Sequence, residues 1–287
     1  MMIPTKTLKN WFSIPVLGFG TWGMWGRYSR DKSNDDARDK DAIRYAIQNG
    51  LTAIDTAELY AGGYAETMLG EVMQDFPRES LFISSKVIGA NASYIAIKNA
   101  CKNSLKRLGT SYIDLYYIHW RDSQFDLQEQ MKAMNELVDE GLIKNIWVCN
   151  FSTASLKLAQ SFSKYPIVAN QVHYNLLYRE SETDWLLDYC QQNDVMLIAW
   201  RPTEKWILSW NTFLDPYTEK YKKTDTQIAI NWLIEQKNVV TLFKSSSHEH
   251  IDENLWALGW ELESQDFEKI KNTFPWQKYV SNAVPLG

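Results

Sequence analysis

The sequence alternates short apolar runs with longer amphipathic stretches, and eight such runs can be counted along its 287 residues. The runs are rich in Val, Ile, Leu and Tyr and are short enough to be buried β-strands. Strict alternation of strands and helices with short connections predicts a parallel sheet, and eight units predict closure into a (β/α)8 TIM barrel. An open doubly wound sheet is the alternative. We expect the strands to end near Gly20, Asp55, Lys86, His119, Cys149, Val172, Trp200 and Phe243.

Amphipathic periodicity fills the intervals between these strands. Several of the periodic stretches begin after Ser, Thr, Asn or Asp, the residues that cap helix N-termini. We expect helices over 36–48, 65–75, 93–108, 126–139, 153–162, 182–192 and 226–235, and a further C-terminal helix over 264–273.

We therefore expect one barrel domain over residues 1–287, ending in a C-terminal helix and an irregular tail. Two long segments interrupt the alternation, at about 24–35 and 203–224, and they follow the first and seventh strands. Loops after barrel strands lie on the rim where barrel enzymes place their active sites, so these two segments are expected to shape the site.

Composition excludes several classes of function. The net charge of −5, without a basic cluster, argues against binding to nucleic acid or acidic membranes. Three widely spaced cysteines predict neither a disulfide framework nor a zinc site, and we expect no bound metal. The first residues lack the apolar core of a signal peptide, and no stretch is long enough to span a bilayer, so a soluble cytoplasmic protein is expected.

One motif is misleading. The run Gly18-Phe-Gly20-Thr-Trp-Gly23 matches the GxGxxG dinucleotide fingerprint. A true fingerprint opens directly into a helix, whereas here the next helix is expected only from about Asp36. We interpret these glycines as places of close backbone approach at the end of the first strand.

Charged and proton-handling residues lie where three successive strands end. Asp55, Lys86 and His119 stand at these ends, and Tyr60 follows Asp55 by five residues. Acid–base catalysis needs a proton donor that faces the substrate. A tyrosine holds its proton tightly, with a pKa of about 10, and a neighbouring lysine favours the phenolate and lowers that pKa. Tyr60, Lys86 and Asp55 can form such a chain, with His119 orienting the substrate. The structural alternative is a buried salt bridge with a packed tyrosine and histidine.

The stretch Asp55-Thr-Ala-Glu-Leu-Tyr60-Ala-Gly-Gly-Tyr-Ala-Glu66-Thr-Met-Leu-Gly70 resembles the signature of the aldo-keto reductase superfamily. Further motifs of that family follow in order. They are Lys86, His119-Trp120, Asn150-Phe151, Asn170-Gln171 and the run from Lys244 to Asn254. The resemblance implies an NAD(P)H-dependent reductase of aldehydes or ketones, in which Asp55, Tyr60, Lys86 and His119 are catalytic.

The resemblance also implies cofactor-binding positions. Asn150 and Gln171 would hold the nicotinamide carboxamide, Trp200 would stack on the ring, and Lys244 would contact the adenosine end. The full set is Gly20, Thr21, Trp22, Asn150, Gln171, Trp200, Lys244, Ser245, His250, Glu253 and Asn254. An apolar substrate mouth is expected from Trp22, Trp25, Tyr28 and Trp120.

Two departures from the family pattern fall on the cofactor side. Cys149 stands where a serine is common, and a thiol donates a weaker hydrogen bond than a hydroxyl. His250 stands where many members carry an arginine for the 2′-phosphate of NADPH, and a mostly neutral histidine binds phosphate less strongly. We expect NADPH to be preferred, with NADH as the alternative.

Two other functions stay open. One is a nicotinamide-binding regulatory or redox-sensor subunit of the same fold with negligible turnover. The other is an unrelated barrel lyase or isomerase that uses Lys86 as a Schiff-base amine. The expected partner is a small carbonyl substrate, and the protein is expected to be a monomer or a weak homo-oligomer. The sequence does not identify the physiological substrate or the direction of reaction.

Overall fold

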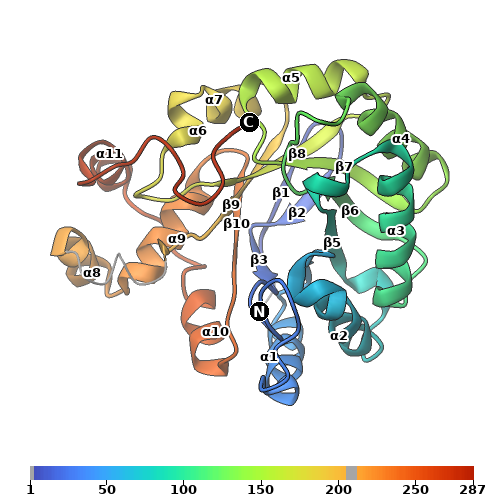
Figure 1. Cartoon of the computed structure of the whole chain (residues 1–287). Helices are drawn as coiled ribbons and strands as arrows, with labels where there is room; N and C mark the ends of the chain where they lie inside the picture. The colour runs from blue at the N-terminus through green and yellow to red at the C-terminus, as the bar shows by residue number, and fades with distance from the viewer. Residues whose placement is uncertain (1–2, 205–211) are drawn as a thin grey trace.

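The computed structural model describes residues 3–204 and 212–287. In these residues eight parallel strands close into a barrel in the order β10-β3-β4-β5-β6-β7-β8-β9 (Figure 1). The predicted (β/α)8 barrel is confirmed, and the doubly wound alternative is wrong because β10 pairs with β3 and leaves no open edge. The strands are β3 (Leu17–Gly20), β4 (Ala53–Asp55), β5 (Phe82–Val87), β6 (Ile113–Ile118), β7 (Ile143–Cys149), β8 (Ile167–His173), β9 (Met196–Trp200) and β10 (Val239–Phe243).

Helices surround the barrel, as Figure 1 shows. They are α1 (Asp36–Gln48), α2 (Tyr64–Met73), α3 (Tyr94–Leu108), α4 (Leu127–Asp139), α5 (Thr153–Phe162), α6 (Glu180–Thr183), α7 (Leu186–Gln192), α8 (Asp215–Tyr221), α9 (Asp225–Glu235), α10 (His248–Leu255) and α11 (Ser264–Thr273). Short 3-10 turns occur at η1 (Tyr60–Gly63), η2 (Arg78–Ser80), η3 (Gly89–Asn91) and η6 (Thr212–Leu214).

Side-chain caps explain several helix starts. Asp35 accepts a hydrogen bond from the amide of Arg38 at α1, and Asp126 accepts from two amides of α4. Thr224 and Gln227 form a capping box at α9. Each cap satisfies amides that the helix itself cannot pair, a contribution of about 1 kcal/mol.

The expected helix over 182–192 is two helices instead, α6 and α7. Trp185 separates them with a left-handed φ of 60°, which a continuous helix does not allow. The short helices α8 and α10 were not expected.

An N-terminal hairpin, also unexpected, packs against the amino ends of the barrel strands. Its strands β1 (Thr5–Thr7) and β2 (Ser13–Pro15) pair antiparallel. Leu8, Phe12 and Ile14 join the apolar cluster inside the barrel. The ammonium of Lys6 donates to the carbonyl of Val239 at 2.7 Å, which fixes the hairpin to the start of β10.

The core has two layers. A large cluster fills the space between the strands and the helices, and a smaller one fills the barrel interior. Alternate residues of a strand face opposite sides, so Tyr116 lies in the outer cluster and Tyr117 in the inner one.

The loop after β3 covers residues 21–35, and α1 begins only at Asp36. This spacing confirms that the GxGxxG run does not open into a helix. A side chain at Gly18 would meet the carbonyl oxygen of Ala53 at 3.2 Å, which agrees with close backbone approach. Of the second expected rim loop, 203–224, residues 205–211 lie outside the described residues.

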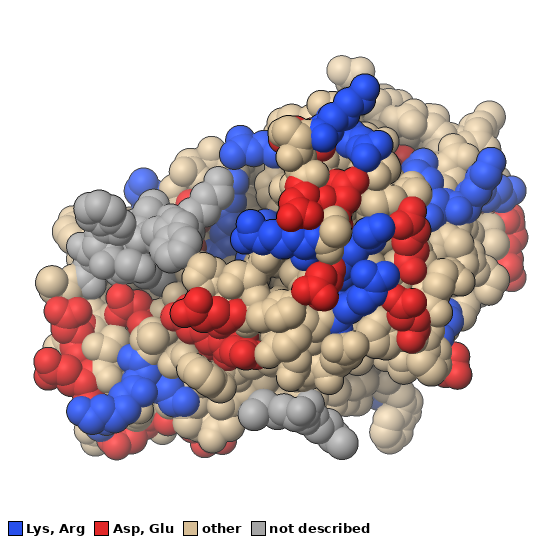
Figure 2. Space-filling model, turned by 90° about the horizontal axis from the view of Figure 1, so that it is seen from below, with Lys and Arg blue, Asp and Glu red and all other residues tan. Residues whose placement is uncertain are grey.

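Basic and acidic side chains are interspersed on the face shown in Figure 2. None of the helices described is both long and apolar enough to cross a membrane. That residues 1–287 form one domain with two rim loops stays a prediction.

Candidate active site

Lys86 lies at the centre of the polar cluster. Asp55 ends β4, and Lys86 lies on β5, where Asp55 pairs with Ser84. The ammonium of Lys86 donates to Asp55 Oδ2 at 2.6 Å, to the carbonyl of Thr56 at 2.7 Å and to Tyr60 Oη at 2.9 Å. Its side chain is 0% exposed. All three ammonium protons thus have acceptors, and the predicted grouping of Asp55, Tyr60 and Lys86 is present.

A tight turn follows Tyr60. Ala61, Gly62 and Gly63 have φ values of 52°, 65° and 87°, a left-handed run that glycine accommodates at little cost. The amide of Ala61 donates to the carbonyl of Arg27 at 2.7 Å, so the turn is tied to the loop after β3.

The pKa of Tyr60 lies well above its ordinary value, because burial disfavours the phenolate and Asp55 adds a negative charge nearby. The net shift is therefore opposite to the lowering expected from Lys86, because burial and Asp55 outweigh the lysine charge. Burial also lowers the pKa of Lys86, and Asp55 works against that shift. Because Asp55 offsets the lysine charge at 2.6 Å, burial prevails, and Tyr60 keeps its proton at neutral pH.

His119 follows β6 and faces the same cluster. Its ring lies 5.7 Å from that of Tyr60 and 5.1 Å from that of Trp120. Its Nδ1 atom is buried and has no hydrogen-bond partner among the described residues. Burial, and next the charge of Lys86, hold the pKa of His119 well below its ordinary value. The imidazole is therefore neutral at pH 7 and can orient a polar substrate atom.

Tyr117 belongs to this cluster, although the sequence did not suggest it. Its hydroxyl lies 3.0 Å from Asp55 Oδ1 and 2.7 Å from Gln171 Oε1. Its ring stacks on Trp147 at 4.3 Å between centroids. The strand register pairs Lys86 with Tyr117, and that register is the signal that could have identified it. Tyr117 links the proton-handling cluster to Gln171.

Asn150 and Gln171 lie side by side at the ends of β7 and β8, where Cys149 pairs with Gln171. Asn150 Nδ2 donates to the sulfur of Cys149 at 3.1 Å, and its Oδ1 accepts from the indole of Trp200 at 3.3 Å. The Nε2 atom of Gln171 is buried without a partner in the described part of the chain. A buried donor without an acceptor is costly, and the carboxamide oxygen of a nicotinamide would suit it.

Trp200 ends β9 and is half-buried. It stacks on His173 at 4.2 Å, and His173 stacks in turn on Tyr178 at 4.1 Å. The two ring nitrogens of His173 lie 2.8 Å from Glu204 Oε2 and 2.8 Å from Ser281 Oγ. Trp200 is thus fixed on one face by a buried aromatic stack of His173 and Tyr178. The hydrogen bonds of His173 link this stack to Glu204 on the rim and to Ser281 in the C-terminal tail.

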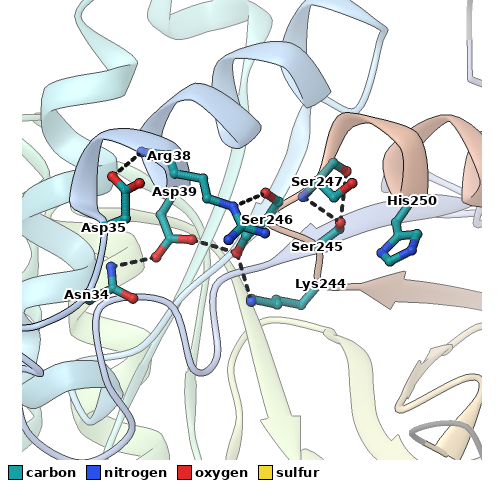
Figure 3. A pocket seen from close by; sticks show the side chains of 9 residues that line it. All are labelled: Asn34, Asp35, Arg38, Asp39, Lys244, Ser245, Ser246, Ser247 and His250. Carbon is teal, nitrogen blue, oxygen red and sulfur yellow. Dashed lines mark hydrogen bonds between the residues drawn. The ribbon is translucent and has the colours of Figure 1, made fainter.

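A polar cavity of about 370 Å³ lies between α1 and the start of α10 (Figure 3). Three of the predicted cofactor residues line it, namely Lys244, Ser245 and His250. The complete lining is Asn34, Asp35, Arg38, Asp39, Lys244, Ser245, Ser246, Ser247 and His250.

Two other predicted cofactor residues do not line this cavity. The carboxylate of Glu253 accepts from Thr224 Oγ1 at 3.1 Å, and the amide of Asn254 donates to the carbonyl of His250 within α10. The first contact ties α10 to the N-terminus of α9, and the second lies within α10.

The predicted residues that follow β3 lie beside the catalytic cluster. Thr21 is buried and donates from its hydroxyl to Thr56 Oγ1 at 3.0 Å. Gly20 pairs with Asp55 in the barrel, and Trp22 stands next in the chain after Thr21. Gly20 and Thr21 therefore lie beside Asp55 and Thr56, Trp22 packs against Tyr60, and none of the three lines the polar cavity.

The expected substrate mouth is formed in part. The ring of Trp22 lies 4.9 Å from Tyr60 and 5.3 Å from Tyr28, which is 68% exposed. Trp120 is half-buried beside His119. Trp25 is 0% exposed and packs in the core, so its expected place in the mouth is wrong, because a fully buried ring cannot border an open entrance.

Among the described residues, no cluster of His, Cys, Asp and Glu could hold a metal ion. Cys101, Cys149 and Cys190 are free and buried. Lys86 is enclosed and engaged with three acceptors, which disfavours its use as a Schiff-base nucleophile.

Comparison with known proteins adds three findings. Methylglyoxal reductase YeaE of Escherichia coli is 34% identical over 269 residues, covering 92% of each chain. The crystal structure of a thermostable aldo-keto reductase, Tm1743, with the inhibitor epalrestat matches with a TM-score of 0.91 and 39% identity over 94% of this chain and 99% of that one. An aldo-keto reductase from Klebsiella pneumoniae in complex with NADPH matches with a TM-score of 0.84 and 31% identity over 96% of each chain.

The family model for the Aldo/keto reductase family matches residues 16–273, from the strand that begins the barrel to the last helix. Together with the barrel and the cluster around Lys86, this match assigns the fold and the motifs to one family. The chain belongs to the aldo/keto reductase family.

Proposed function

We propose that this protein is an NADPH-preferring reductase of aldehydes or ketones. The observation that carries the proposal is the hydrogen bond of 2.9 Å between Lys86 and Tyr60 within a buried cluster that also holds Asp55. Family membership and the NADPH-bound relative support the same assignment.

Tyr60 would donate the proton to the carbonyl oxygen. A bound nicotinamide nucleotide would supply the hydride to the carbonyl carbon. The raised pKa of Tyr60 keeps its phenol protonated at neutral pH. Proton transfer to the substrate remains favourable, because an alkoxide is a far stronger base than a phenolate. The neutral imidazole of His119, with its unpartnered Nδ1, would hold the substrate oxygen in place.

Three groups would position the nicotinamide. Gln171 offers a buried Nε2 donor, Asn150 lies beside it, and Trp200 presents a ring fixed by His173. The cavity at α10 would take the 2′-phosphate, because Lys244 and Ser245 line it. NADPH is therefore proposed over NADH.

The substrate is proposed to be a small aldehyde or ketone. YeaE carries the name methylglyoxal reductase, and here the rings of Trp22 and Trp120 would border a narrow apolar entrance. We propose a cytoplasmic location and a monomer or weak homo-oligomer.

The test mixes the purified protein with NADPH and a panel of methylglyoxal, glyoxal and aromatic aldehydes, and follows NADPH absorbance. We expect turnover, and we expect Tyr60→Phe to lower kcat by about 10²–10⁴-fold, the usual contribution of a general acid. Trp fluorescence titration checks that the variant still binds NADPH. Binding of NADPH without turnover of any carbonyl by the wild type would reject the enzyme and favour the sensor alternative.

A further inference from the structure

Helix α1 carries three basic residues, and Arg38 differs from the other two. Lys40 is paired with Glu71 at 3.0 Å, and Arg44 is paired with Asp75 at 2.6 Å. Arg38 has no carboxylate partner among the described residues. Within the described part of the chain its side chain makes one hydrogen bond, from Nε to the carbonyl of Ser246 at 2.9 Å. The two terminal nitrogens of its guanidinium therefore have donors to offer.

Arg38 and Lys244 converge on the same cavity from opposite ends of the barrel sequence. Figure 3 shows both side chains reaching toward Ser246. The ammonium of Lys244 donates to Ser246 Oγ at 2.9 Å, while Arg38 binds the carbonyl of the same residue. Ser246 thus holds two cations at one wall of the cavity.

Like charges so close together repel each other. Loss of hydration lowers the pKa of Lys244, Asp39 opposes that shift, and the charge of Arg38 adds to it. Such an arrangement gains stability when an anion binds between the cations.

Two carboxylates also line the cavity, but both are already engaged. Asp39 is buried and accepts from Ser246 Oγ at 2.6 Å, from Asn34 Nδ2 at 2.9 Å and from the amide of Trp25 at 3.2 Å. Asp35 caps α1 through the amide of Arg38. In Figure 3 both stand on the side of Asn34, across the cavity from His250.

The start of α10 adds a third attraction for an anion. The side chain of its N-cap residue, Ser247, makes no capping hydrogen bond, so it does not satisfy the first backbone amides of the helix. Helix N-termini with uncapped amides favour anionic ligands.

We infer that Arg38 is a specificity-determining residue for NADPH, and that its guanidinium binds the 2′-phosphate together with Lys244. The inference rests on the cofactor preference proposed above. It assigns to α1 the fixed positive charge that an arginine at position 250 would otherwise supply. A guanidinium binds phosphate with a planar pair of donors, which an imidazole ring does not offer.

The experiment compares the affinities of wild type, Arg38→Ala and Arg38→Lys for NADP⁺ and NAD⁺ by isothermal titration calorimetry. NAD⁺ lacks only the 2′-phosphate. We expect Arg38→Ala to weaken NADP⁺ binding by about ten- to a hundredfold, the usual range for a charge-assisted hydrogen bond, and to leave NAD⁺ binding unchanged. Arg38→Lys should lose less, because it keeps the charge.

Arg44→Ala is the matched control, since Arg44 lies on the same helix but is paired with Asp75. It should change neither affinity. An Arg38→Ala variant that binds both nucleotides as the wild type does, or loses both equally, would overturn the inference.

The same titrations separate this inference from the proposed function. A wild type that prefers NADP⁺ and loses the preference in Arg38→Ala supports the inference even if no carbonyl is reduced. A wild type that binds NAD⁺ as tightly as NADP⁺ would overturn both the inference and the proposed cofactor preference.

Discussion

Lys86 and Lys244 both lie at the carboxyl ends of barrel strands, but their surroundings are opposite. Lys86 is fully buried, and three protein acceptors use all its protons. Lys244 lines a cavity, and among the residues that the structure describes its ammonium donates only to the hydroxyl of Ser246. Lys86 therefore has all its hydrogen bonds within the protein, whereas Lys244 can use its charge to bind a ligand. Stability should depend on the first and cofactor affinity on the second.

The largest expected effect comes from making the same substitution at both lysines. Lys86→Met leaves the carboxylate of Asp55 buried without its cation, which typically costs about 3–5 kcal/mol of unfolding free energy. Lys244→Met should change stability by no more than about 0.5 kcal/mol and weaken NADPH binding instead. Urea denaturation and cofactor titration measure the two quantities. Equal losses of stability in the two variants would contradict the contrast.

A smaller effect is expected from Tyr117→Phe, which removes only a hydroxyl. That hydroxyl contacts Asp55 and Gln171, so its loss should lower kcat about tenfold or more and also weaken cofactor binding. Tyr116→Phe is the control, because Tyr116 lies on the opposite face of β6 in the outer core. Steady-state kinetics and fluorescence titration report both effects. The positioning role fails if the two variants behave alike.

The smallest effect concerns His119 and pH. Its pKa is well below the ordinary value of about 6.5 in the folded protein, so the unfolded chain binds a proton first as pH falls. Stability from this group is present above about pH 6.5 and declines toward the lower folded pKa, by at most about 1.4 kcal/mol per pH unit. In His119→Gln the unfolding free energy should fall less steeply between about pH 6.5 and 5. Urea denaturation across this range provides the measurement, and a slope as steep as that of the wild type would contradict the prediction.

The alternating strands and helices of the barrel were predictable from sequence. Strand ends such as Asp55 and Cys149, and helices such as 36–48 and 153–162, follow from hydrophobic period and capping residues. The N-terminal hairpin was not, because strands of three residues carry too little pattern. The division of 182–192 at Trp185 was also missed, since non-glycine residues rarely adopt a left-handed φ.

The candidate site divides in the same way. Asp55, Tyr60 and Lys86 could be grouped because their spacing matches successive strand ends. Tyr117 and Arg38 could not, because their importance depends on register and on which partner a side chain lacks. The direction of the Tyr60 pKa shift depends on burial and on the charge of Asp55 nearby, and a sequence motif gives neither the burial nor the distance.

The cavity of Arg38 and Lys244 lies where the barrel closes, beside the pairing of β10 with β3. The bond from Arg38 to Ser246 joins residues 208 positions apart, and the bond from Ser246 to Asp39 joins residues 207 apart. Contacts this distant form only after most of the chain is ordered, because closing a long loop costs entropy first. A nucleotide bound there would hold together α1 and the start of α10, which meet where β10 pairs with β3. A ligand that binds only the folded protein stabilises it by mass action. The free energy of unfolding should therefore rise with the concentration of cofactor.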